Sequence, residues 1–354
     1  MKSYNEILSD VTKTATKIPQ SDYLDTGKYR IFDQGKEYSV GFSNDEQGVV
    51  SDYPYIIFGD HTRVVKYVNE PCFIGADGVK LLKVINKDFN PRFVYYNILA
   101  KPIENQGYAR HFKFLKEIQF TEKTLSVQTN IVTELDTIQS AIDNKKQQLA
   151  LLDEAVKSEF VEMFGDLDCN IKTIEQTCTM KSGTTFSKDE ENDSGEIFYI
   201  KVSGMNLPEN DKYIKTSLSF VSRKVAGKTI IPANSIIFPK RGGAIGTNKK
   251  RITEQEICID LNTMAVTPSN ELNIQYLYQY FQNLDMGKLY NGSTVPQINN
   301  KDIGPLKIKV PPLELQQQFA GFVQQIDKSK FVVKQQIADL QELLDYKMNK
   351  YFGD

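Results

Sequence analysis

Two stretches in the second half of the chain have residue types that could bind a polyanion. The run Lys240-Arg241-Gly242-Gly243 sets two cations beside two glycines, whose missing side chains let a phosphate approach the backbone. Further along, hydroxyl and amide groups are available to read base edges, at Ser293, Thr294, Gln297 and Asn299. We predict these residues as nucleic-acid contacts; a turn that merely closes the domain is the alternative.

The first half has comparable polar runs. One follows an apolar stretch and the other lies further along, and the predicted contacts are Asp60, His61, Thr62, Arg63 and Lys66, then Arg110, His111 and Lys113. His61 beside Asp60 could form a catalytic dyad, but no serine or cysteine nucleophile motif accompanies the pair. A surface hydrogen bond is the better interpretation.

Other enzymatic motifs are incomplete. Asn90-Pro91-Arg92-Phe93 is close to the N-P-P-[YF] tetrapeptide of amino-methyltransferases, but arginine replaces the second proline and no glycine-rich turn precedes it. The glycines of residues 241–246 fit neither the dinucleotide spacing nor the phosphate loop. We predict no catalytic residue in this chain. The alternative is an enzyme with an unrecognised site, either a DNA methyltransferase or a nuclease.

Composition places the chain among cytosolic proteins of more than one domain. Its 354 residues exceed the usual size of a single domain, and its net charge of -2 gives no overall attraction to nucleic acid. No apolar run is long enough to span a membrane, so we expect a cytoplasmic protein without membrane contact. The cysteines lack metal-ligand spacing, which predicts reduced thiols and no metal site, at Cys72, Cys169, Cys178 and Cys258.

An internal repeat organises the sequence. Lys146-Gln147-Gln148-Leu149-Ala150 returns as Lys334-Gln335-Gln336-Ile337-Ala338, and the triplet Phe164-Gly165-Asp166 returns as Phe352-Gly353-Asp354. Each residue of the second copy stands 188 positions after its partner, as Phe352 does after Phe164.

Both copies have apolar residues at steps of three and four, which is the seam of a coiled coil. The seam residues are Ile131, Leu135, Ile138, Ile142, Leu149, Leu152, Val156 and Met163 in the first copy, and Phe319, Val323, Ile326, Val333, Ile337, Leu340, Leu344 and Tyr351 in the second. Lys145 and Lys330 interrupt the seams. Two long helices are predicted, over residues 125–166 and 311–354; a helix packed only on its own domain is the alternative.

Two globular segments, residues 1–124 and 167–310, precede the helices. Each has short β-type runs and one helical stretch, around residues 92–99 and 273–282, which predicts mixed α+β domains. Their openings are also similar, with residues 7–19 matching residues 174–186. A duplicated unit of one domain and one helix predicts pseudo-two-fold symmetry.

The arrangement resembles the specificity subunits of Type I restriction-modification systems over nearly the whole chain. The resemblance rests on the duplication and on four stretches: Gly292-Ser293-Thr294-Val295-Pro296-Gln297-Ile298, Val310-Pro311-Pro312-Leu313-Glu314-Leu315-Gln316-Gln317-Gln318-Phe319, Ile57-Phe58-Gly59-Asp60-His61-Thr62-Arg63 and Phe73-Ile74-Gly75-Ala76-Asp77-Gly78-Val79. The first domain departs from the second, because it has Tyr108-Ala109-Arg110-His111-Phe112 in place of a clear counterpart to the first stretch.

The resemblance implies two DNA target-recognition domains separated by two long antiparallel coiled-coil helices. Each domain would read one half of a bipartite double-stranded DNA site, and two methylation subunits would dock on the helices. S-adenosylmethionine would bind those partners and not this chain, and a motor-nuclease restriction subunit would complete the complex. A coiled-coil adaptor without DNA binding is a further alternative.

Overall fold

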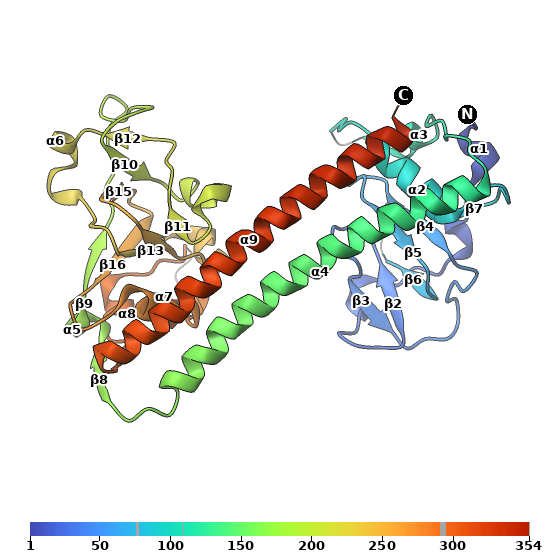
Figure 1. Cartoon of the computed structure of the whole chain (residues 1–354). Coiled ribbons are helices and arrows are strands. Elements are labelled where there is room, and N and C mark those ends of the chain that lie inside the picture. Colours follow the sequence, from blue (N-terminus) through green and yellow to red (C-terminus); the bar gives the residue numbers. More distant parts are fainter. Residues whose placement is uncertain (76–77, 108, 291–294, 354) are drawn as a thin grey trace. The chain divides into compact units, whose positions relative to one another are not determined.

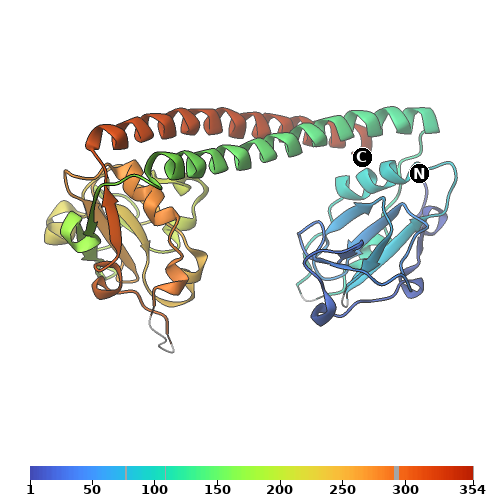
Figure 2. The same ribbon diagram turned by 90° about the horizontal axis from the view of Figure 1, so that it is seen from below.

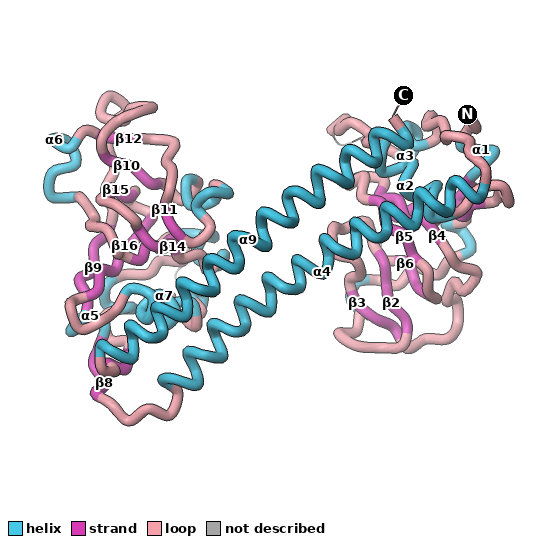
Figure 3. Tube along the Cα trace, in the orientation of Figure 1, coloured by secondary structure: helices cyan, strands magenta, loops and turns pink. Residues whose placement is uncertain are grey.

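The computed structural model describes residues 1–75, 78–107, 109–290 and 295–353. The chain divides into two compact units: the first comprises residues 1–147 and 333–354, and the second comprises residues 148–332. Each unit contains both sheets and helices, as the colouring of Figure 3 shows. The predicted α+β class is therefore confirmed.

The first unit contains two sheets of short strands. An antiparallel sheet has the order β1-β7-β4-β5, and a second sheet has the order β3-β2-β6 with β2 and β6 parallel. The elements are α1 Tyr4–Ile7, β1 Leu8–Asp10, β2 Tyr29–Phe32, β3 Gly41–Ser43, β4 Tyr55–Gly59, β5 Val65–Val68, β6 Cys72–Ile74, β7 Val79–Val84, α2 Pro91–Ala100 and α3 Phe112–Leu115, with single 3₁₀ turns at Thr12–Thr14 and Gln20–Asp22.

The second unit contains three sheets, with the orders β11-β14-β13-β16-β9, β12-β10-β15 and β17-β8. Its elements are β8 Asn170–Thr173, α5 Ile174–Thr177, β9 Cys178–Ser182, β10 Ile197–Ile200, β11 Tyr213–Ile214, β12 Phe220–Val221, α6 Arg223–Ala226, β13 Ile236–Pro239, β14 Arg251–Thr253, β15 Ile257–Ile259, β16 Thr263–Pro268, α7 Ile274–Gln282, α8 Asn300–Ile303 and β17 Lys307–Val310. Its 3₁₀ turns include η6 Gly242–Thr247 and η7 Met286–Lys288.

The two units follow the same path through their sheets. The order β1-β7-β4-β5 corresponds to β9-β16-β13-β14, and the parallel pair β2-β6 corresponds to β10-β15. Phe58 lies opposite Lys80, just as Phe238 lies opposite Met264. We call two residues counterparts when they occupy the same position on this shared path.

The opening match of residues 7–19 to residues 174–186 was wrong by three residues. The structure makes α1 the counterpart of α5, because both helices begin with a capping box, built by Ser3 and Glu6 in one and by Thr173 and Gln176 in the other. Each box satisfies two backbone donors at the start of a short helix and so fixes where the following strand begins.

Two long helices, α4 Leu125–Phe164 and α9 Leu313–Phe352, contain 40 residues each (Figure 1). The start of α4 and the end of α9 belong to the first unit, and the remaining parts belong to the second. In the second unit these parts run antiparallel, because Lys330 pairs with Asp153 while Phe160 packs on Phe319. The polar break at Lys330 thus has a carboxylate partner.

Part of the predicted seam is buried in the cores of the two units. The seam residues within the core clusters are Ile131, Leu135, Ile138, Ile142 and Leu344 in the first unit, and Val156, Phe319 and Val323 in the second; Val333 is buried outside these clusters. At about 25 cal/mol per Å² of apolar surface, a single fully buried Leu or Ile side chain contributes about 1.5–3 kcal/mol.

A buried glutamine near the start of α4 fixes the beginning of α2. The Gln128 side chain is 0% exposed, and its Oε1 accepts the backbone N–H of Asn90 at 2.8 Å. Its Nε2 donates to the carbonyls of Asp88 and Lys123, both at 2.8 Å. Because Asn90 is the N-cap of α2, this glutamine ties the long helix to the short one.

The second unit repeats this arrangement with Gln316 of the Pro-Pro-x-x-x-Gln stretch. Its Oε1 accepts the N–H of Asn273, the N-cap of α7, at 2.7 Å. Its Nε2 donates to the carbonyls of Glu271 at 2.9 Å and Pro311 at 2.8 Å. The stretch therefore has a structural explanation within the unit.

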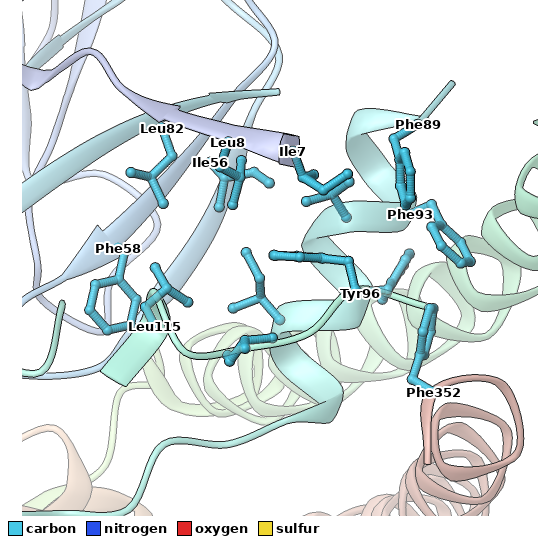
Figure 4. Close-up of a cluster of buried hydrophobic side chains, with 14 of the residues drawn as sticks. Ile7, Leu8, Ile56, Phe58, Leu82, Phe89, Phe93, Tyr96, Leu115 and Phe352 are labelled. Atoms are coloured by element: carbon cyan, nitrogen blue, oxygen red, sulfur yellow. The ribbon is translucent and has the colours of Figure 1, made fainter. Parts of the chain in front are cut away.

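The repeated Phe-Gly-Asp triplet provides an aromatic anchor at the end of each long helix. Phe352 of α9 packs on Phe93 of α2, with ring centroids 5.0 Å apart (Figure 4). Phe164 of α4 packs on Tyr276 of α7, which is orange in Figure 2, at 4.8 Å. Each short helix is thus held by the glutamine of one long helix and the terminal phenylalanine of the other.

Candidate nucleic-acid interface

The predicted runs after β4 and β13 lie at the same place in the two units. Counterpart registers make Asp60 the equivalent of Lys240 and His61 the equivalent of Arg241. In the first unit Arg63 adopts φ 62°, and β5 begins two residues later, at Val65. The polar residues Asp60 to Arg63 therefore form the turn between β4 and β5.

A second chain segment closes each turn from the side. In the second unit Ile298 donates its N–H to the Lys240 carbonyl at 2.8 Å, and Gly242 donates to the Pro296 carbonyl at 2.8 Å. In the first unit His111 donates its N–H to the Asp60 carbonyl at 2.8 Å. His111 and Ile298 are thus counterparts, and Arg110 is the counterpart of Gln297.

In the second unit the structure brings two predicted contact runs together. The exposed Arg241 donates from Nη2 to Oε1 of Gln297 at 3.3 Å, and Gln297 donates from Nε2 to Oδ1 of Asn299 at 2.8 Å. Asn299 is the N-cap of α8 and forms a capping box with Asp302. Ser293 and Thr294 lie outside the described residues.

Lys240 lies beneath this surface. Its side chain is 9% exposed and its Nζ donates to Oγ of Ser182 at 2.8 Å. Burial lowers the pKa of Lys240, and the charge of Arg241 lowers it further. Lys240 therefore supports the turn and adds positive potential below Arg241.

The backbone conformation requires glycine at position 242 of the turn but not at position 243. Gly242 has φ +72°, a conformation that other residues rarely adopt. Gly243 has no such constraint, and a Cβ added there would meet nothing within 4 Å. Among the described residues of the second unit, neither backbone conformation nor lack of space explains glycine at position 243.

In the first unit the turn rests on two buried polar residues. Asp60 is 4% exposed, and its Oδ1 accepts the N–H of Phe112 at 2.8 Å. His111 is 0% exposed, and its Nδ1 lies 3.0 Å from the Asp60 carbonyl oxygen. Both side chains hold the turn together and neither is presented to solvent.

Polar and basic side chains line a cavity of about 250 Å³ beside this turn. His61 and Arg110 were predicted from the sequence, whereas Thr12, Lys17 and Lys80 were not. Lys80 comes from β7, and its Nζ lies 3.2 Å from Asp10. These additional residues are distant in sequence, so only the sheet register brings them to the site.

The remaining predicted residues of the first unit occupy different environments. Lys66 is 5% exposed and lies 3.4 Å from Asp33, and burial lowers its pKa. Arg63 donates to the carbonyl of Ile103 at 3.1 Å. Thr62 donates its hydroxyl to the carbonyl of Gln34. Lys113 is exposed, with its Nζ 4.7 Å from the centre of the Phe114 ring. Lys66 and Arg63 thus have internal partners.

Metal binding, thiol reactivity and a membrane span each place requirements on the described residues. Within it, no group of three or more His, Cys, Asp or Glu residues is placed to hold a metal ion. Burial raises the pKa of the Cys72 thiol to about 12 and that of Cys178 to about 11, which disfavours the thiolate. None of the described helices is long and apolar enough to cross a membrane.

Comparisons with known proteins agree on one family. Residues 167–342 match the model of the Type I restriction modification DNA specificity domain. The specificity subunit of the Type I restriction enzyme EcoR124I/EcoR124II from Escherichia coli is 23% identical over 90% of this chain and 85% of its own. The MjaIX specificity subunit from Methanocaldococcus jannaschii is 25% identical over 68% of this chain and 61% of its own.

A solved structure has the same fold. The S subunit of a Type I restriction-modification system from M. genitalium covers 100% of this chain and 96% of its own, with a TM-score of 0.59 and 15% identity. The chain therefore belongs to the family of Type I restriction-modification specificity subunits, whose members provide DNA specificity and no catalysis of their own.

Proposed function

We propose that the two units each read one half of a bipartite double-stranded DNA site. The observation that carries the proposal is that the turns after β4 and β13 share one scaffold but carry different side chains. Asp60 and Lys240 have opposite charges at counterpart positions, and His61 occupies the position of Arg241. A common scaffold with different exposed groups suits two recognition surfaces for two different half-sites.

We assign the recognition role to residues 1–124 and 167–310, and within them to the exposed side chains. His61, Arg110 and Lys113 in the first segment, and Arg241 in the second, are exposed. Their buried neighbours Asp60, Lys66, His111 and Lys240 are proposed to hold the surfaces in shape. Protein contacts on rigid elements preserve the geometry that directional base reading needs.

The long helices, with residues 125–166 and 311–354, are proposed as an antiparallel coiled-coil spacer with pseudo-two-fold symmetry. Forty residues at about 1.5 Å per residue extend about 60 Å. As a separate expectation about the DNA, a gap of roughly 5 to 8 base pairs would set the half-site centres about one helical turn apart.

We also propose that two methylation subunits dock on these helices. Exposed apolar side chains on α9 suit such a contact, with Phe331 70% and Val332 52% exposed in the second unit and Tyr346 61% exposed in the first. S-adenosylmethionine would be bound by those partners, and a motor-nuclease restriction subunit would join them. The complex would work in the cytoplasm, where its DNA lies.

The test is methylome sequencing of a host without adenine methylation that expresses this chain with its cognate methylation subunit. We expect methylated adenines in a two-part motif that disappears when this chain is omitted. Exchanging residues 1–124 for the corresponding segment of a relative should change one half of the motif and leave the other. A motif that is independent of the chain would favour the adaptor or an enzyme with an unrecognised site.

A further inference from the structure

We infer that Arg241 reads a guanine in the half-site of the second unit, and that Gln297 and Asn299 position it without touching bases. The inference rests on the proposed function and deepens it. It also reassigns two of the residues predicted as contacts to a supporting role.

A chain of side-chain hydrogen bonds starts at Arg241. Gln297 accepts from Nη2 of Arg241 with its oxygen and donates with its nitrogen to Asn299, so its amide has one orientation that serves both neighbours. Asn299 is itself fixed by its capping box with Asp302 at the start of α8. The guanidinium is therefore held by a relay that ends on a helix.

The relay leaves most N–H donors of the Arg241 guanidinium available for another partner. An arginine side chain has five N–H donors in a planar fork, and the relay engages Nη2 only. The side chain is exposed, and no described carboxylate forms an ion pair with it. A fork held at one edge and open elsewhere suits the O6 and N7 acceptors of guanine, which arginine contacts in pairs.

A second cation, Lys240, lies below the Arg241 guanidinium. Lys240 is buried, with its Nζ donating to Oγ of Ser182, and it lies close enough to Arg241 for the arginine charge to lower the pKa of Lys240. Two adjacent cations favour an electron-rich edge such as that of guanine over a donor such as the amino group of cytosine. Gly243, which has open space where a side chain would be, leaves room for DNA to approach.

The first unit supports the inference by contrast. At the counterpart positions it has His61 in place of Arg241, Arg110 in place of Gln297, and Phe112 in place of Asn299. A phenylalanine has no group to accept from a neighbouring amide, so the relay does not exist there. The guanine preference should accordingly belong to one half-site only.

The experiment uses the chain assembled with its cognate methylation subunit, after the wild-type motif has been established by methylome sequencing. Competition binding to duplexes in which each base pair of the motif is changed in turn would be measured for wild type, Arg241→Gln, Arg241→Lys and Gln297→Leu. Arg223→Gln is the matched control, because Arg223 is exposed in the same unit but paired with Glu256 at 2.7 Å.

We expect Arg241→Gln to lose about 10- to 100-fold of discrimination at one G·C pair in one half-site. Arg241→Lys should lose most of it too, since lysine keeps the charge and not the fork. Gln297→Leu should lose part of it at the same base pair, and Arg223→Gln should lose none. If each variant keeps its discrimination in the half-site read by the first unit, folding and assembly are intact.

Uniform weakening at all positions, restored by Arg241→Lys, would show a phosphate contact and overturn the inference. The inference would also be overturned if Arg241→Gln left discrimination unchanged at every base pair. The same holds if the discrimination it lost were at an A·T pair. A wild-type complex with no motif that depends on this chain would instead refute the proposed function itself, and the two failures are therefore distinguishable.

Discussion

The two units share the buried glutamines that hold their short helices, but they differ in the residues of the turns after β4 and β13. Gln128 and Gln316 are 0% exposed and make the same three kinds of hydrogen bond in their own units. At the turns the units diverge, with buried Asp60 on one side and buried Lys240 on the other. The scaffold thus tolerates a change of charge directly below the exposed groups, provided that the backbone hydrogen bonds closing the turn are kept.

The largest effect should come from removing an aromatic anchor. Phe164→Ala and Phe352→Ala each delete a buried ring, and we expect each to lower the free energy of unfolding of its own unit by about 3–5 kcal/mol. Denaturant-dependent hydrogen exchange, read on peptides from residues 1–147 and from residues 148–332, would separate the two effects. If either substitution destabilised both units equally, or left its own unit unchanged, the equivalence of the anchors would be wrong.

A second prediction concerns a lysine that the first unit lacks. Lys250 is 1% exposed, and its Nζ donates to Oδ1 of Asn248 and to the carbonyl of Leu284, both at 2.8 Å. Burial lowers the pKa of Lys250 from 10.5 to about 8. Its counterpart in the first unit is Val65, which does not titrate.

The lowered pKa makes the stability of the second unit depend on pH. Between about pH 8 and 10.5 the unfolded chain binds more protons than the folded chain, so stability rises with pH in this window. Lys250→Met should remove a rise of about 2 kcal/mol between pH 8 and 10. Peptides of the first unit, followed by the same exchange measurement, are the control. A pH profile unaltered by Lys250→Met would contradict the prediction.

The smallest effect should come from Gly321 in α9. This exposed glycine lies inside a long helix, a Cβ added there would meet nothing within 4 Å, and Thr133 is its counterpart in α4. Gly321→Ala should raise the free energy of unfolding of the second unit by about 0.5–1 kcal/mol, because alanine restricts the unfolded chain and favours helix. Urea unfolding of the variant beside wild type would measure the change, and a fall in stability would show that the glycine has a structural role.

The helix pattern was readable from sequence because it is local and periodic. The seam residues around Leu135 and Val323 recur at steps of three and four, and the structure has α4 and α9 in those regions. The capping residues Ser3 and Thr173 were also present in the sequence, and using them would have corrected the opening match. The assignment of the two globular segments to DNA reading stays a prediction.

The site was harder to predict because burial of a polar residue depends on distant partners. His111 is buried against the carbonyl of Asp60, fifty-one positions earlier, and Lys66 against Asp33 across the sheets. Neither pairing has a local signal. The relay from Arg241 to Asn299 likewise joins two segments whose contact follows only from the bridge between Arg241 and Gln297.

The division of the long helices between the units also has a consequence for biosynthesis. The first unit needs residues 333–354, including Phe352, to cover Phe93. A ribosome delivers residues 333–354 only after residues 148–332 of the second unit. The first unit, whose synthesis begins earlier, therefore matures after the second. A nonsense mutation between codons 333 and 352 should damage the first unit and spare the second.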